Sequence, residues 1–161
     1  MEQRIARMQD LVRAAREVRN RYSLDTKLNL EMLVRCNEMV SRDFQLLTPF
    51  VNALAGVAKL ECGPEIRKPS QAATVIHADF EAHVSLRGLV DVAVESKRLE
   101  KQLAEKQKHL QSTQAKLANS AFVDKAPAEV VHQQRDLINE LQCQIDTIRE
   151  NLSDLRAPDS R

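Results

Sequence analysis

The strongest constraint on the fold is the scarcity of helix-breaking residues in the second half of the chain. After Gly88 there is no further glycine, and Pro127 is the only proline before Pro158. These two residue types weaken a helix interior most, by about 1 and 3 kcal/mol relative to alanine. We therefore predict two long helices within 87–156, with one break at about 119–126 and Pro127 at the start of the second helix.

Both predicted helices carry a seam in which positions step by three and four residues, the heptad pattern of coiled coils. Five of eight positions are apolar in the first seam and seven of eight in the second. Because the break is short, we expect an antiparallel coiled-coil hairpin, an arm roughly 45 Å long. Lys106 lies on the first seam and would either fix the register or extend its charge to solvent. The seam positions are 92, 96, 99, 103, 106, 110, 113 and 117, then 131, 134, 138, 141, 145, 148, 152 and 155.

The first 22 residues have the pattern of an Arg-rich amphipathic helix. Their apolar residues recur at helical spacing, which places them on one face, while five arginines point elsewhere. We expect this face to pack on the residues that follow. The face comprises Ile5, Met8, Val12, Ala15 and Tyr22.

Residues 23–86 predict a small α+β domain with three or four strands. Alternating polarity indicates a strand at 28–35, and a short apolar run another at 57–62. A hairpin is expected within 73–86, turning near residues 78–79. Between the first two strands we expect two short helices, one capped by Asn37 and one that begins with Thr48 and Pro49 and ends at Gly56. The whole chain is thus predicted to be α+β: an N-terminal helix and small globule, a long helical hairpin at 87–156, and a tail at 157–161.

Several function classes lack their usual residues in this sequence. The four histidines and three cysteines have no metal-ligand spacing, so neither a metal site nor disulfides are expected. The glycines are isolated, which disfavours a phosphate-binding loop, and no nucleophile motif is present. We therefore predict no catalytic residues and no cofactor in this chain. The N-terminus lacks the features of a secretory signal and no membrane span is evident, so we expect a cytoplasmic protein.

The net charge of +1 conceals an uneven distribution of charge. Residues 87–125 contain eight basic and five acidic residues, whereas 126–156 contain three basic and six acidic ones. Lys97, Lys101 and Lys108 lie near one face of the first long helix, outside its seam. Such a strip can bind RNA phosphates without reading sequence. The alternative is that these charges pair with acidic residues of the second helix, such as Asp136 and Glu140.

Short motifs along the arm resemble the carboxyl-terminal region of bacterial valyl-tRNA synthetase. They are Leu-Arg-Gly-Leu-Val-Asp at 86–91, Lys-Arg-Leu-Glu-Lys-Gln-Leu at 97–103, Lys-Leu-Ala-Asn at 116–119 and Phe-Val-Asp-Lys-Ala-Pro-Ala-Glu-Val-Val at 122–131. Upstream the resemblance is weaker but collinear. Residues 1–22 are similar to the last helix of the anticodon-binding bundle and 28–86 to the small linker domain.

This resemblance implies a tRNA-binding arm that reaches the outer corner of the tRNA, where the D and T loops meet. By this resemblance the chain would hold the tRNA for valine beside the catalytic portion of the same synthetase, whose ATP-binding motifs have no counterpart here. We expect a monomer. The rival interpretation is a coiled-coil module for protein interaction or assembly. The predicted RNA-binding residues are Lys97, Arg98, Lys101, Lys108 and Lys116, with Lys125 and Arg135 as lesser contributors.

Overall fold

The computed structural model describes residues 1–156, and the predicted tail at 157–161 lies outside this range. The chain divides into two compact units. The globular unit contains residues 1–91 and the end of the last helix from Asp154 onward, and the arm unit contains residues 92–153. None of the helices within residues 1–156 combines the length and apolar character needed to cross a membrane. The mixed class predicted from the sequence, α+β with a helical hairpin, is confirmed.

A four-stranded sheet forms the centre of the globular unit. Its strands are β1 (Leu30–Cys36), β2 (Val57–Gly63), β3 (Ala72–Ile76) and β4 (Phe80–Ser85), in the order β2-β1-β4-β3. The pairs β1–β4 and β3–β4 are antiparallel, whereas β1 and β2 are parallel. This mixture follows from the connections, because β3 and β4 form a hairpin while a helical crossover joins β1 to β2.

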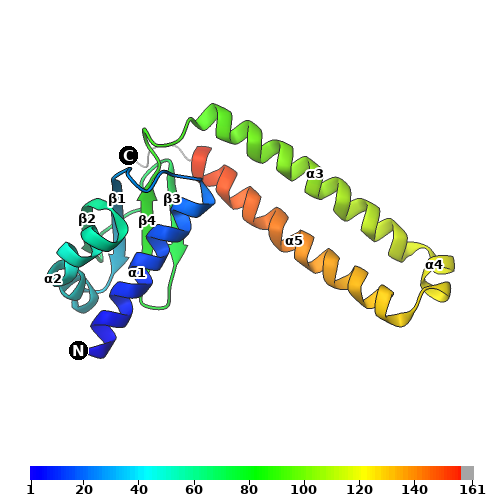
Figure 1. Cartoon of the computed structure of the whole chain (residues 1–161), viewed down its shortest axis with the longest axis horizontal. Coiled ribbons are helices and arrows are strands. Elements are labelled where there is room, and N and C mark those ends of the chain that lie inside the picture. Colours follow the sequence, from blue (N-terminus) through cyan, green and yellow to red (C-terminus); the bar gives the residue numbers. More distant parts are fainter. Residues whose placement is uncertain (157–161) are drawn as a thin grey trace. The chain divides into compact units, whose positions relative to one another are not determined.

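Helices α1 (Glu2–Arg21) and α2 (Glu38–Ala55) cover one face of this sheet (Figure 1). The alternation of β1 creates that face, since Met32 and Val34 are fully buried whereas Glu31 and Arg35 are exposed. The buried side chains are mostly aliphatic. Two aromatic rings, those of Phe44 and Phe80, meet edge to face with their centroids 5.4 Å apart.

The buried face of α1 matches the predicted one at Val12, Ala15 and Tyr22, but not in the first turns of the helix. Ile5 is 45% exposed, and burial of apolar side chains begins at Leu11. From there Leu11, Ala15 and Val18 are fully buried, and Tyr22 is nearly so. The first turns of α1 have helical spacing but leave Ile5 without full apolar burial, which periodicity alone does not reveal.

The ends of α2 follow the sequence signals. The side chain of Asn37 accepts a hydrogen bond from the backbone N–H of Val40 at 2.9 Å, which confirms it as the N-cap. Gly56 ends the helix in the left-handed conformation, with φ at 63°. A left-handed residue after a helix is usually glycine because a Cβ is strained there.

The prediction of two short helices in this region is wrong, because α2 continues without interruption through Pro49. Thr48 does not cap a new helix. Its hydroxyl donates to the backbone oxygen of Phe44 at 2.9 Å, one turn earlier in the same helix. Pro49 is exposed and has no backbone N–H to donate, so it removes one hydrogen bond from the solvent side of the helix.

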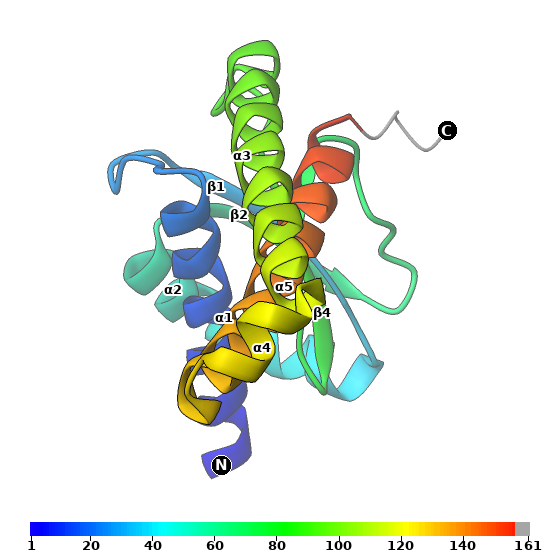
Figure 2. The ribbon, with the colours of Figure 1, turned by 90° about the vertical axis from the view of Figure 1, so that its right-hand side faces the viewer.

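The arm unit is an antiparallel helical hairpin, as predicted (Figure 1). Its long helices are α3 (Val92–Ala118) and α5 (Ala128–Arg156). The predicted break is not a plain loop, because it contains the short helix α4 (Ser120–Lys125). Asn119 begins α4 by accepting a hydrogen bond from the N–H of Ala121 at 3.0 Å. Figure 2 views the hairpin from its tip, where α4 joins the ends of the two long helices.

Burial along the hairpin follows the two predicted seams. Every seam position of α3 is buried or half-buried, and so is every seam position of α5. Leu99 retains 3% exposure and Leu141 retains 2%. At roughly 1.5 Å per residue, the 27 residues of α3 extend for about 40 Å. The heptad pattern therefore located the packed side of each helix correctly.

Candidate nucleic-acid interface

Three lysines form a strip on the outer side of α3. With 3.6 residues per turn, Lys97, Lys101 and Lys108 fall within about 40° around the helix, roughly half a turn from the seam. All three are exposed. We call these residues the lysine strip. Packing of the hairpin therefore leaves their charges in solvent, where a large polyanion can reach them.

The side chains of the lysine strip have no internal partner. Among residues 1–156, neither an ion pair nor a hydrogen bond involves the ammonium groups of Lys97, Lys101 or Lys108. The same holds, within that range, for Lys116, Lys125 and Arg135, which are also exposed. Arg98 differs, because its Nε donates to the carboxylate of Glu95 at 2.9 Å. Among the predicted RNA-binding residues, Arg98 thus already has its charge paired with a carboxylate.

The acidic residues of α5 do not neutralise this strip. Asp136 lies 3.4 Å from the ring of His132, one turn away on the same helix. Glu140 accepts a hydrogen bond from Gln144 at 3.1 Å, also on α5. The alternative pairing across the hairpin is therefore not observed for these two carboxylates.

Lys106 belongs to a different environment from the strip. It is half-buried on the seam and lines a hollow of about 330 Å³ with Cys143, Thr147 and Ile148, among others. The sequence left open whether this lysine fixes the register or extends to solvent. Its position beside an isoleucine accounts for the burial of its aliphatic stem.

The arginines of α1, by contrast, are committed within the globular unit. Arg7 contacts Asp79 at 2.9 Å and Asp43 at 3.2 Å, and Arg4 contacts Asp43 at 2.6 Å. The hydrogen bond from Arg7 lowers the pKa of the Asp79 carboxyl below its ordinary value and raises the pKa of the guanidinium. Farther along α1, Arg21 contacts Glu17 at 2.6 Å. Few of these charges remain for a nucleic acid.

Arg19 is the most confined of these groups, with 7% exposure. Its guanidinium donates to the backbone oxygens of Asp25 at 2.8 Å, Leu28 at 2.7 Å, Ala55 at 3.0 Å and Gly56 at 3.2 Å. It therefore joins the end of α1 to the end of α2 and the loop before β1. The helical spacing of residues 1–22 does not distinguish Arg19 from the other arginines of the helix.

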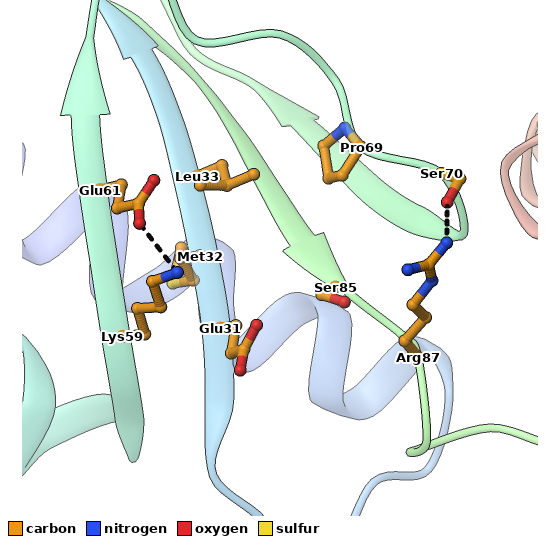
Figure 3. A pocket seen from close by; sticks show the side chains of 9 residues that line it. All are labelled: Glu31, Met32, Leu33, Lys59, Glu61, Pro69, Ser70, Ser85 and Arg87. Carbon is orange, nitrogen blue, oxygen red and sulfur yellow. Dashed lines mark hydrogen bonds and ion pairs between the residues drawn. The ribbon is translucent and has the colours of Figure 1, made fainter. Parts of the chain in front are cut away.

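The opposite face of the sheet carries a hollow of about 380 Å³ that contains charges of both signs (Figure 3). Lys59 and Glu61 on β2 form an ion pair across 2.9 Å. Arg87 donates to the hydroxyl of Ser70 at 2.9 Å. The basic groups of this hollow thus have partners of their own, unlike the lysine strip.

Groups suited to metal binding or nucleophilic chemistry are dispersed. Within residues 1–156, no three His, Cys, Asp or Glu side chains gather closely enough to hold a metal ion. The cysteines are free thiols. Burial raises the pKa of Cys62 to about 12, which keeps this thiol protonated at neutral pH. Cys143 is exposed on the arm.

Comparison with known proteins agrees with the geometry of the arm. Residues 91–156 match the family described as the valyl tRNA synthetase tRNA binding arm. The chain is 28% identical over 159 residues to the valine--tRNA ligase of Rhodopirellula baltica, covering 98% of this chain and 15% of the relative. It is 31% identical over 157 residues to that of Thermotoga maritima, covering 97% and 17%.

Residues 91–156 thus belong to the family of valyl-tRNA synthetase tRNA binding arms. A third relative, the valine--tRNA ligase of Oceanobacillus iheyensis, is 33% identical over 137 residues, which cover 83% of this chain. The chain spans about one sixth of the length of these synthetases, between 15% and 17%. The resemblance deduced from the arm motifs is therefore confirmed. The relatives also align with the globular unit, where the sequence motifs were weaker.

Proposed function

We propose that this chain is the tRNA-binding part of a valine--tRNA ligase, and that its arm holds the tRNA while catalysis takes place elsewhere in the parent enzyme. The observation that carries this proposal is the lysine strip, whose three charges are exposed and unpaired among residues 1–156 of a hairpin of the arm family. Each ammonium group can neutralise one phosphate and release its counterion.

The shape of the arm suits backbone recognition better than reading of bases. A rigid pair of helices with lysines on its outer side presents point charges at fixed spacing, which fit phosphates along a folded RNA. In this proposal the arm contacts the outer corner of the tRNA, and the cognate tRNA is the one for valine. In this proposal ATP and valine bind only to the catalytic portion of the cytoplasmic parent enzyme. The chain alone is therefore expected to show no valine-dependent pyrophosphate exchange.

The decisive experiment is tRNA affinity across a salt series. The triple variant Lys97→Ala, Lys101→Ala, Lys108→Ala should flatten the log–log dependence of affinity on salt by roughly two units, because each lost phosphate contact removes about 0.7 to 0.9. A matched control removes three exposed positive charges from the globular unit: Lys27→Ala, Arg42→Ala and Arg67→Ala. Its slope should equal that of the wild type.

Three outcomes would contradict the proposal. An unchanged slope in the arm variant would remove the lysine strip from the interface. Equal flattening in both triple variants would show that only total charge matters, not its place on the arm. Absence of tRNA binding by the wild type would refute the assigned function itself.

The rival function, an assembly module that recruits a helix through the arm, lacks its expected surface. A helix-binding face requires an apolar stripe beyond the seam. Among the large apolar residues of α3, α4 and α5 up to residue 156, only Val94 stands out as exposed, at 64%. This single valine near the start of α3 does not form a stripe, so the arm favours RNA over a partner helix.

An apolar stripe does exist on α2, and we assign it to contact with the remainder of the synthetase. Met39, Leu46, Phe50 and Leu54 are each at least half exposed, and helical spacing places them within about 80° around α2. The length of the relatives, about six times that of this chain, supports this choice of occupant. Such a contact within one polypeptide agrees with a monomeric parent enzyme.

This assignment is tested in the full-length enzyme by hydrogen exchange. Leu46→Ser with Phe50→Ser should increase exchange in the segment of the catalytic portion that covers α2. Arg42→Ser, on the same helix but outside the stripe, is the control. If neither variant changes exchange outside this chain, α2 is not the contact.

A further inference from the structure

A groove runs along one side of the arm, between the two long helices. Its volume is about 360 Å³ and it lies wholly within the arm unit. Its lining is polar apart from two seam residues. The α3 residues are Gln107, Leu110, Gln111 and Gln114, and the α5 residues are Gln142, Ile145 and Arg149.

The three α3 glutamines form a row that adjoins the lysine strip. Helical geometry places Gln107, Gln111 and Gln114 within about 60° of one another, between the seam and the strip. No side chain of residues 1–156 forms a hydrogen bond with these three amides. Each amide therefore offers both a donor and an acceptor to a ligand in the groove.

Across the groove, α5 presents Gln142 and Arg149, which lie seven residues apart and so on the same side of the helix. Both side chains contact the same exposed residue, Asp146. Gln142 donates to Asp146 at 3.1 Å, and the guanidinium of Arg149 lies 3.9 Å from the same carboxylate. Arg135 occupies the equivalent position one heptad earlier, is exposed, and has no partner among residues 1–156.

The other side of the hairpin offers no such row. There Lys106, Cys143, Thr147 and Ile148 line the smaller hollow described above. Gln144 donates from its side-chain nitrogen to Glu140 while its buried side-chain oxygen has no partner among residues 1–156, and the hydroxyl of Thr147 donates to the backbone of Cys143 at 3.0 Å. The two sides of the hairpin thus differ in kind: one presents a row of three exposed or half-exposed amides, and the other a half-buried lysine and one buried amide oxygen.

We infer that the glutamine groove is a second RNA-binding site on the arm, which takes ribose 2′-hydroxyl groups of the strand whose phosphates contact the lysine strip. This inference rests on the proposed tRNA-binding function. It adds which side of the arm faces the RNA and which chemical groups are recognised there.

The amides of the groove match the sugar better than the phosphate. A phosphate oxygen only accepts hydrogen bonds, whereas an amide offers a donor and an acceptor at fixed positions, as does a 2′-hydroxyl. Uncharged contacts release no counterions, so they add affinity without adding salt dependence. The 2′-hydroxyl also distinguishes RNA from DNA. The lysine strip and the glutamine groove therefore have different experimental signatures.

The test compares a tRNA transcript with a DNA strand of the same sequence, both binding to the full chain. The double variant Gln111→Ala, Gln114→Ala should weaken tRNA binding about tenfold, as expected for two lost neutral hydrogen bonds. It should leave DNA binding and the salt slope unchanged. The matched control, Gln102→Ala with Gln133→Ala, removes two amides outside the groove and should bind tRNA as the wild type does.

Each outcome decides the inference. Unchanged tRNA affinity in the groove variant, or equal losses for tRNA and DNA, would overturn it, while the lysine variant would still decide the proposed function. Equal weakening by the control pair would also overturn it. Alanine is the best helix former, and both groove residues are exposed, so circular dichroism should confirm an intact arm.

Discussion

Helix α1 and helix α3 are both amphipathic and rich in basic residues, but their charges have opposite surroundings. On α1, Arg7 contacts two carboxylates and Arg19 four backbone oxygens. On α3, Lys97 and Lys101 have no partner among residues 1–156. A count of charges in the sequence cannot separate these two situations. The partners of each basic group, not its presence, distinguish a residue that stabilises the fold from one that can bind a polyanion.

The largest effect that tests this comparison is expected at Arg19. The variant Arg19→Ala should lower the free energy of unfolding by about 3 kcal/mol, because it leaves several backbone oxygens without a donor. Urea denaturation measures this loss. Arg13→Ala, which removes an exposed arginine paired with Asp10 on the same helix, should cost less than about 1 kcal/mol. Equal effects would refute the distinction.

A substitution at Gly56 tests the contact between the Arg19 guanidinium and the end of α2 by changing the acceptor residue instead of the arginine. A Cβ on Gly56 would lie 2.6 Å from Nη2 of Arg19, and φ is +63°. Gly56→Ala should therefore cost about 2 kcal/mol or more, from backbone strain together with displacement of the guanidinium. Gly88→Ala is the control, since φ is +71° there but nothing lies within 4 Å of the added carbon. The excess loss at Gly56 in urea denaturation measures the contribution of Arg19, and no excess would contradict it.

A smaller effect is expected from pH, through His83 on β4. This ring is buried, and burial is the main cause that lowers its pKa below 6.5. Lys68 and Arg35 lower the pKa further, while Glu81 and Asp154 oppose them. The folded state therefore disfavours the protonated ring. Above pH 6.5, the unperturbed pKa of histidine, the neutral His83 ring makes its full contribution to the free energy of unfolding. That contribution is lost as the pH falls below 6.5 toward the lowered pKa of the folded state.

The variant His83→Gln should accordingly reduce the fall in unfolding free energy between about pH 7.5 and pH 5.5. Urea midpoints at several pH values measure it. His109→Gln, at an exposed position on α3, should retain the pH dependence of the wild type. A similar reduction in both variants would mean that burial of His83 is not the cause.

The smallest effect is expected from the lysine strip on stability. Exposed side chains outside special environments contribute within about 0.5 kcal/mol. The triple variant Lys97→Ala, Lys101→Ala, Lys108→Ala should therefore unfold at nearly the same temperature as the wild type, while its RNA binding changes. A large drop in melting temperature would show that these lysines support the arm, as the arginines of α1 support the globule.

Local sequence signals predicted the arm better than the globule. The heptad spacing located both seams, because the contacts of a helical hairpin repeat along each helix. The outward position of the lysines follows from the same spacing. At the break the signal was incomplete: Asn119 can cap a helix, but only the structure shows that the six residues after it form α4.

In the globule, contacts between distant residues decided what the sequence left open. Thr48 and Pro49 resemble a helix start, yet packing of α2 on the sheet continues through them. The strand order β2-β1-β4-β3 depends on pairings between segments far apart in the chain. Arg19 is buried because its acceptors include Ala55 and Gly56, 36 and 37 residues away. The spacing of residues within α1 carries no information about acceptors so far along the chain.

Lys106 has a consequence for how copies of this protein meet. If two α3 helices paired in parallel, each would place its Lys106 against the other, and two ammonium groups would share one seam. Thr113, nearly fully buried in the hairpin, would repeat the mismatch seven residues later. The more apolar seam of α5 carries no lysine and accepts α3 without this repulsion. The polar positions of α3 thereby favour pairing within one chain over self-association, and keep the outer face of the arm free for its ligand.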